Sequence, residues 1–217
     1  MVTRLLGAVS LAVLTSLGAC EKTRGLARPV RTDCGDSQPR RFFDDVFYGL
    51  RPSESEIPNA FAPILDQMGE PSLSCSVDFD AAYRILFSAP NGMAMAIRMV
   101  SSDGQWTLIS VPFDKKLQKT VTRSERPVTP SELRQFLGMV AKFDFWVRSP
   151  NPTPTSTDTD VVVLHSGVWI FEGSADGQYH AIVRASLPRE REFNAIGKWL
   201  FTAANYEVPG EFLVPAY

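Results

Sequence analysis

The chain has 217 residues, of which 44% are hydrophobic, 21% are charged and 11% are aromatic, and its formal net charge is -2 at pH 7. The hydrophobic and charged fractions lie near the averages for globular proteins, which excludes a disordered or collagen-like chain. Because the charge is nearly balanced, no overall field draws the protein onto nucleic acid, and nucleic acid is not an expected partner. The length favours a single folded domain.

The first twenty residues have the layout of a secretory signal. A positively charged start that includes Arg4 is followed by a short apolar run from Leu5 to Leu14, and Leu17-Gly18-Ala19-Cys20 closes the segment. The apolar run is too short to span a hydrocarbon core, which takes about 20 helical residues. We therefore expect residues 1–19 to be a cleaved signal peptide rather than a transmembrane anchor.

Cys20 follows two small residues, with Leu17 three positions before it. This pattern resembles the lipobox of bacterial lipoproteins, which implies that Cys20 is acylated, by palmitate among other chains, and becomes the first residue of the mature protein. Acyl chains contribute about 0.8 kcal/mol for each buried CH₂ group, so the anchor would be permanent. The residue after Cys20 is Glu21 rather than aspartate, which by the same resemblance implies the outer membrane, facing the periplasm. The alternative is a plain secreted protein.

Cleavage before Cys20 leaves 198 residues with a net charge of -3, because Arg4 is lost. We expect residues 20–41 to form a lipidated tether and residues 42–217 to form one domain. The tether is rich in arginine and poor in large apolar residues. Such a basic stretch can lie on anionic lipid headgroups, or it can be a solvated linker.

Two cysteines remain once Cys20 is assigned to lipid. Cys34 and Cys75 are an even pair in an oxidising compartment, where a disulfide is the default. The bond would close a loop of about 40 residues, for a nominal 3 to 4 kcal/mol. Since no short cysteine or histidine spacing accompanies them, the sequence predicts no metal site.

In chain order, the domain begins with two predicted short helices, over residues 41–50 and 62–68. Strand-like runs follow at 83–87, 93–100 and 106–111, separated by Pro90-Asn91-Gly92 and Ser102-Asp103-Gly104. Asn-Gly and Asp-Gly accept positive φ, as hairpin turns require, so the pattern predicts an antiparallel meander. Residues 117–124 alternate weakly and predict a fourth strand.

The second half begins with a strong helix start, Thr129-Pro130-Ser131-Glu132. An exposed, proline-rich loop is expected at 149–160. Three strands follow, at 161–164, 168–172 and 179–185, and a turn over Gly173 to Gly177 joins the last two. The final helix is expected at about 189–205. The predicted fold class is α+β, a mostly antiparallel sheet formed by the meander and a C-terminal hairpin, with helices packed on it.

A candidate binding site follows from that five-residue turn. It would place Glu172 opposite Gln178 and Ile170 opposite His180, so that Glu172, His180 and Arg184 share one face of the sheet. These three side chains could orient a carboxylate ligand or a proton transfer. The alternative is a half-exposed face tied together by an ion pair.

The chain contains no G-x-S-x-G, S-x-x-K, H-E-x-x-H, G-x-G-x-x-G or P-loop sequence. We therefore predict no catalytic residue and no cofactor.

From about Ala82 to Asn205, the order of features resembles a family of bacterial envelope proteins with no established activity. The resemblance supports the fold and leaves the function open. The residues that carry it are Tyr83-Arg84, Asp103-Gly104, Thr129-Pro130-Ser131-Glu132, Asp144-Phe145-Trp146, Trp169, Glu172-Gly173, Gly177, Tyr179-His180, Arg184, Pro188, Phe193 and Ile196-Gly197.

These observations favour a membrane-anchored lipoprotein of the cell envelope that acts as a non-catalytic binding module for a protein or small molecule. Two alternatives stay open. One is an envelope hydrolase that uses Glu172, His180 and Arg184, and the other is a periplasmic inhibitor or protective protein.

Overall fold

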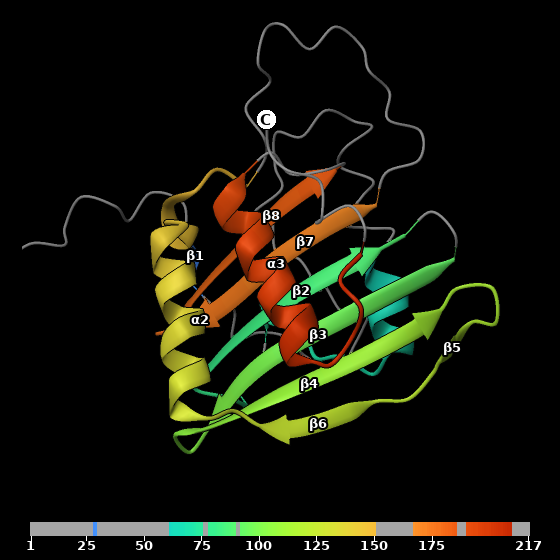
Figure 1. Ribbon diagram of the computed structural model, residues 1–217, viewed down its shortest axis with the longest axis horizontal. Helices are drawn as coiled ribbons and strands as arrows, with labels where there is room; N and C mark the ends of the chain where they lie inside the picture. Colours follow the sequence, from blue (N-terminus) through green and yellow to red (C-terminus); the bar gives the residue numbers. More distant parts are fainter. Residues whose placement is uncertain are drawn as a thin grey trace, which may run out of the picture.

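An eight-stranded antiparallel sheet forms the centre of the computed structural model (Figure 1). The structure describes residues 28–29, 61–75, 78–89, 92–150, 167–185 and 190–209. Strands follow one another across the sheet in the order β1-β8-β7-β2-β3-β4-β5, and β6 also pairs with β4. The strands are β1 (Arg28–Pro29), β2 (Ala81–Ser88), β3 (Met93–Ser102), β4 (Gln105–Asp114), β5 (Lys119–Thr120), β6 (Ser124–Pro127), β7 (Val168–Ala175) and β8 (Gln178–Ala185).

The predicted meander of β2, β3 and β4 is present, with longer strands than expected. Its second turn is two residues long, and both residues have positive φ, 52° at Asp103 and 72° at Gly104. This backbone matches the right-handed twist of the paired strands, so Asp-Gly sets the register here. Because every strand pairing is antiparallel and the helices pack on the sheet, the predicted α+β class is confirmed.

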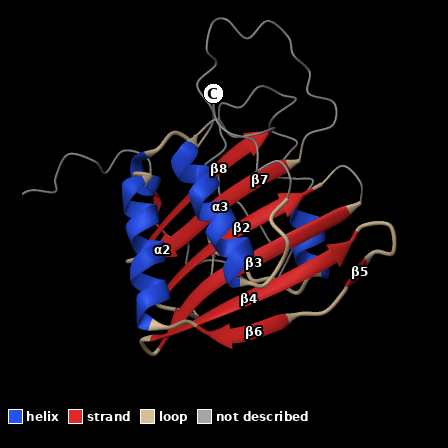
Figure 2. Cartoon of the chain, in the orientation of Figure 1, coloured by secondary structure: helices blue, strands red, loops and turns tan. Residues whose placement is uncertain are grey.

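Two helices, α2 (Pro130–Lys142) and α3 (Arg191–Ala203), cover one face of the sheet (Figure 2). Each has its apolar residues at helical spacing and buries them against odd-numbered residues of β2 and β3. This is the larger part of the core and is rich in aromatic side chains. Its buried members include Phe136, Val140, Phe193, Ile196 and Leu200 from the helices and Tyr83, Ile85, Phe87, Ile97, Trp169 and Phe171 from the sheet.

The opposite face packs against a short helix at 61–67 and the segment that follows it. Phe61 and Leu65 lie in that helix, and Leu73 lies beyond it; all three are buried. They pack with even-numbered residues of β2 and β3 and odd-numbered residues of β4, such as Leu86 and Phe113. The sheet is thus covered on both faces, which accounts for the largely hydrophobic sequences of its central strands.

Some predicted elements differ from those observed. The predicted strand at 117–124 is instead two short strands, β5 and β6. The tether boundary at residue 42 is not sharp, because Arg28 and Pro29 pair with Tyr179 and Gln178 at the edge of the sheet. The predicted helix at 41–50, the strand at 161–164 and most of the loop at 149–160 lie outside the described residues.

The start of α2 follows the predicted capping pattern. The Thr129 side chain accepts a hydrogen bond from the Glu132 backbone N–H, and the Glu132 carboxylate accepts one from the Thr129 N–H at 2.9 Å. Arg126 adds two contacts to the same carboxylate, the shorter at 2.6 Å. The Arg126 guanidinium and the Thr129 N–H lower the pKa of Glu132 to about 2. Glu132 is therefore a charged anchor for this end of the helix.

Replacing Glu132 by glutamine is expected to lower the free energy of unfolding at pH 7 by about 1 kcal/mol. Because the native pKa lies below the ordinary 4.5, the ionised carboxylate stabilises the fold above pH 4.5, and this contribution is lost as the pH falls toward 2. Thermal unfolding measured across that range should show a shallower pH dependence in Glu132→Gln than in the wild type. The control is Glu125→Gln, which breaks an exposed ion pair with Arg123. If the pH dependence became equally shallow in this control, Glu132 would not be the source of the effect.

Candidate functional site

The hairpin of β7 and β8 has a different register from the one predicted. Its turn consists of only Asp176 and Gly177, with φ of 52° and 68°, and both strands continue up to it. As a result Gly173, not Ile170, lies opposite His180, and Ala181, not Gln178, lies opposite Glu172. The predicted five-residue turn from Gly173 to Gly177 is wrong, because Asp-Gly alone makes the two-residue turn.

This change separates the three candidate residues. Residues directly opposite each other share a face, and neighbours along a strand alternate, so an odd change in register moves one strand to the other face. Glu172 lies on the face covered by the segment at 61–75, with Ala181 and Tyr179. His180 and Arg184 lie on the α2 and α3 side, with Ile182. The predicted face shared by Glu172, His180 and Arg184 does not exist.

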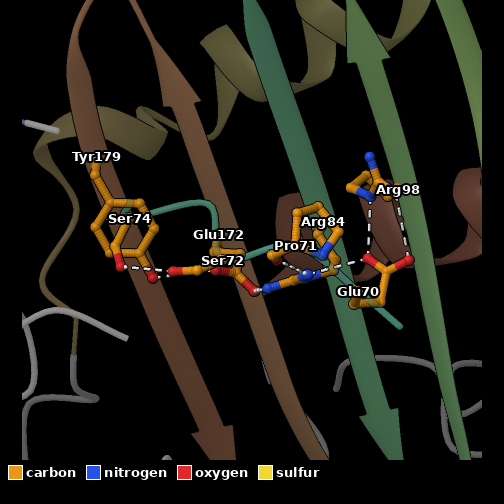
Figure 3. Close-up of polar contacts among 8 residues, drawn as sticks. All are labelled: Glu70, Pro71, Ser72, Ser74, Arg84, Arg98, Glu172 and Tyr179. Carbon is orange, nitrogen blue, oxygen red and sulfur yellow. Dashed lines mark hydrogen bonds and ion pairs between the residues drawn. The ribbon is translucent and has the colours of Figure 1, made fainter. Parts of the chain in front are cut away.

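Glu172 belongs instead to a buried chain of ion pairs and hydrogen bonds (Figure 3). Its Oε1 lies 2.8 Å from Nε and 2.7 Å from Nη2 of Arg84, the residue directly opposite on β2. Its Oε2 accepts a hydrogen bond of 3.1 Å from the Tyr179 hydroxyl. Arg84 also donates from Nη1 to Glu70 Oε2 at 3.0 Å and to the Pro71 carbonyl at 2.8 Å.

Arg98 extends the network onto β3. It lies directly opposite Arg84 and donates from Nε to Glu70 Oε2 at 3.0 Å. Two arginines and two glutamates thus balance in charge, and the side chains of Glu70, Arg84 and Glu172 are fully buried. Since Glu70 comes from the segment after the 61–67 helix, the network ties that segment to four adjacent strands, β8, β7, β2 and β3. We refer to Glu70, Arg84, Arg98, Glu172 and Tyr179 as the charge network.

The two carboxyl groups of the charge network differ in pKa. Burial alone would raise the pKa of Glu70, but the guanidinium groups of Arg84 and Arg98 outweigh it and lower the pKa below its ordinary value. Burial raises the pKa of Glu172, and Arg84 and Tyr179 offset only part of that effect. Glu70, between two guanidinium groups, is therefore the more firmly ionised carboxylate.

His180 and Arg184 hold the loop after α2. His180 Nε2 lies 2.9 Å from the Arg148 carbonyl oxygen, and the imidazole packs edge-on against Phe145. Arg184 donates to Glu190 Oε1 at 2.8 Å and to the Pro150 carbonyl at 3.2 Å. Both side chains are buried. The contacts described for these two side chains are with backbone carbonyls, Glu190 and the Phe145 ring, and they favour a structural role.

Gly173, opposite His180, leaves the space into which aromatic side chains pack. A Cβ atom there would lie 2.8 Å from the rings of both Phe145 and Tyr83. Such distances are far below van der Waals contact, so only glycine permits this packing. Of the two neighbours Glu172 and Gly173, the first therefore belongs to the charge network and the second to the aromatic core.

A shallow polar pocket lies at the Asp103-Gly104 end of the meander, with a volume of about 330 Å³. Val100 lines it together with Asp103 and uncharged polar side chains of β3 and β4. The lining residues are Val100, Ser102, Asp103, Gln105 and Thr107.

Sequence reasoning missed Glu70, Arg84 and Arg98. A signal was present, because each arginine stands alone inside an apolar strand, in Tyr83-Arg84-Ile85 and Ile97-Arg98-Met99. A charged residue at such a position needs a buried partner. Nothing local identifies that partner, since Glu70 is 14 residues from Arg84 and Glu172 is 88 residues from it.

Cys20 and Cys34 lie outside the described residues, so the lipidation of Cys20 and the Cys34–Cys75 disulfide stay predictions. Within the described ranges, no helix is long and apolar enough to cross a membrane. The same ranges contain no group of three or more histidine, cysteine, aspartate or glutamate side chains arranged to hold a metal ion.

No protein-family model matches the chain, and no curated protein is similar to it.

Proposed function

We propose that this protein is a lipid-anchored lipoprotein of the bacterial cell envelope, and that its domain is a non-catalytic binding module held at the membrane surface. The sequence Leu17-Gly18-Ala19-Cys20 carries the anchoring part of the proposal. The compartment it implies is the periplasmic side of the outer membrane, with an envelope protein or small molecule as the partner.

The charge network supports the non-catalytic part. Glu172 is fully buried and is held by Arg84 and Tyr179, so its use as a general acid or base would require the network to open. The register also counts against a hydrolase site that combines Glu172 with His180 and Arg184, because Glu172 lies on the opposite face of the sheet. The polar residues singled out in the sequence are therefore better explained as supports of a rigid domain.

Replacing Cys20 by alanine is expected to abolish lipid attachment and release the protein from the membrane fraction. The acyl chains supply the binding energy of the anchor, at about 0.8 kcal/mol for each buried CH₂ group, and the variant has none. Labelling of growing cells with an alkyne analogue of palmitate, followed by fractionation, measures both effects.

The control for this experiment is Cys34→Ser, which removes a thiol but leaves the lipobox unchanged. It should keep the label and stay with the membrane. Retention of label in Cys20→Ala, or absence of label from the wild type, would contradict the proposed anchor.

The binding role is tested by photo-crosslinking in cells from exposed positions around the domain, such as Gln105 in the polar pocket. A discrete adduct formed by the anchored wild type and lost in Cys20→Ala is the expected result. Failure to form any adduct from positions on all sides of the domain would count against a binding module.

A further inference from the structure

Three large hydrophobic side chains are exposed among the described residues, and all three lie at one corner of the sheet. They are Met93 (40% exposed), Leu117 (61%) and Val121 (55%). Met93 begins β3 opposite Asp114, and the Val121 N–H bonds the neighbouring Pro112 carbonyl at 2.9 Å. Leu117 lies in the turn that connects β4 to β5. Single exposed hydrophobics are ordinary, but a group that converges on one turn marks an interaction surface.

The same turn is basic. Lys115, Lys116 and Lys119 lie within five residues of one another, and Lys116 and Lys119 are exposed. The Lys116 side chain runs over Gly92, next to Met93, since a Cβ at Gly92 would lie 3.1 Å from its Cγ. Lysine stems that cover apolar surface while the ammonium groups stay in water are typical of membrane interfaces. We call Met93, Lys116, Leu117, Lys119 and Val121 the basic corner.

The only acidic side chain in this turn is engaged with the backbone. Asp114 Oδ1 accepts hydrogen bonds from the N–H groups of Lys116 at 2.8 Å and Leu117 at 3.0 Å. These bonds hold the turn closed and fix Leu117 at its tip. Asp114 thus shapes the basic corner while leaving it an excess of positive charge.

The opposite end of the sheet is acidic. The two-residue turns there contain Asp103 and Asp176, and Asp80 accepts hydrogen bonds from Ser101 and Gly104 at the same end. At that end Ala81 pairs with Ser101 and with Ala175. The basic corner lies next to Asp114, at the other end of the strands. The domain is therefore polarised along its strands, and an anionic surface attracts one end and repels the other.

We infer that the basic corner is a second membrane contact, in which Leu117 inserts among anionic lipid headgroups while Lys116 and Lys119 bind their phosphates. The inference rests on the proposed lipid anchor, which places the domain beside a bilayer. The partner is a lipid surface rather than a protein groove, because the corner is an exposed turn that combines apolar side chains with flanking cations.

The position of the anchor suits a second contact. Arg28 pairs with Tyr179 of β8, next to the Asp176-Gly177 turn, so it lies at one edge and at the acidic end of the sheet. Lys119 pairs with Asp114 of β4, at the other edge and at the other end of the strands. Cys20 precedes Arg28 by only eight residues, which reach at most about 29 Å. The sheet is about as wide as this reach at about 4.8 Å per strand, and its diagonal is longer. A tether of this length lets the acidic end stand away from the bilayer while the basic corner touches it. Two separated contacts, one covalent lipid and one basic corner, would fix how the domain lies on the membrane.

The test uses the full mature lipoprotein in vesicles of phosphatidylcholine alone or with about a third phosphatidylglycerol. An environment-sensitive NBD dye is attached at Leu117→Cys, and signal from native cysteines is measured on the unsubstituted protein. The dye should brighten and shift to the blue in the anionic vesicles only. The same dye at Gln105→Cys, at the acidic end of the meander, should not respond.

Charge reversal tests the role of the lysines. Lys116→Glu with Lys119→Glu should abolish the response of the dye at position 117, because each lysine near an anionic surface strengthens binding about fivefold. Arg134→Glu with Lys142→Glu, on α2, is the matched control and should keep the response. Circular dichroism confirms that each variant is folded.

The outcomes separate this inference from the proposed function. A protein that carries the acyl group by mass spectrometry, but whose dye at position 117 stays in water in anionic vesicles, overturns the basic corner and leaves the anchor standing. A response at position 105, or an unchanged response after reversal of Lys116 and Lys119, also overturns it. Absence of the acyl group defeats the proposed anchor, and the inference with it.

Discussion

Replacing Arg84 by methionine is expected to lower the free energy of unfolding by about 3–5 kcal/mol, because it removes one partner of a buried ion-pair network. Methionine fills similar space but leaves Glu172 with the Tyr179 hydroxyl as its remaining donor within the charge network. Glu70 keeps Arg98. The cost comes from an uncompensated buried carboxylate rather than from lost packing.

Urea unfolding of the wild type and Arg84→Met measures this loss. The matched control is Arg123→Met, which breaks an exposed pair with Glu125 and should change stability by less than about 1 kcal/mol. The double variant Arg84→Met with Glu172→Gln should recover most of the lost stability, since no unpaired charge is then buried. If Arg84→Met lost no more stability than Arg123→Met, the charge network would not stabilise the fold as described.

Replacing Trp169 by alanine is expected to cost a similar amount, about 3–5 kcal/mol. The indole is fully buried, stacks on Phe87 with ring centroids 4.0 Å apart, and meets the Phe201 ring of α3 edge-on at 5.9 Å. Its loss leaves a cavity between α3 and the sheet. Hydrogen exchange should therefore show the amides of α3 becoming less protected than those of α2.

Trp106→Ala is the control for the Trp169 prediction. Trp106 is only partly buried and stacks on Tyr83 at a longer centroid distance of 6.4 Å, so its removal should cost clearly less. Equal losses for the two variants in denaturant unfolding, or uniform loss of protection over both helices, would contradict the role of Trp169 in docking α3.

The charge network and the aromatic core lie on opposite faces of the same strands, and the two features together explain the rigidity expected of the domain. The α2 and α3 face is held by apolar burial, which is not directional. The other face adds hydrogen-bonded ion pairs that admit only one placement of the segment at 61–75. We therefore expect Arg84→Met to loosen that segment before it affects α3.

Local sequence patterns predicted several elements well. Thr129-Pro130-Ser131-Glu132 starts α2 with both hydrogen bonds of the capping box, and Asp103-Gly104 forms the turn of the meander. Each of these depends on contacts within a few residues, so the sequence nearby contains all the information that is needed. The α+β class followed from the same local patterns.

The predicted site failed at one local step with a long-range consequence. Choosing Gly173 to Gly177 as the turn, instead of Asp176-Gly177, displaced the register by an odd number of residues. Side chains alternate between the two faces along a strand, so an odd shift in register moves every residue of one strand to the other face. The predicted register therefore grouped Glu172 with His180 and Arg184, although Glu172 points to the opposite face. The Asp-Gly rule that succeeded at 103–104 would have given the correct register here as well.

The sequence by itself determined the α+β class, the capped helix and the meander, because each depends on short-range chemistry or on periodicity. The lipobox-like start is also a short-range pattern, and the anchor it indicates stays a prediction. Only the tertiary structure decided where the charged residues go. Arg84 must find Glu70 and Glu172, which lie 14 and 88 residues away, and that choice depends on strand order and on which face each residue occupies. The energy of burying a charge makes such a partner necessary, but only the packed sheet determines which one it is.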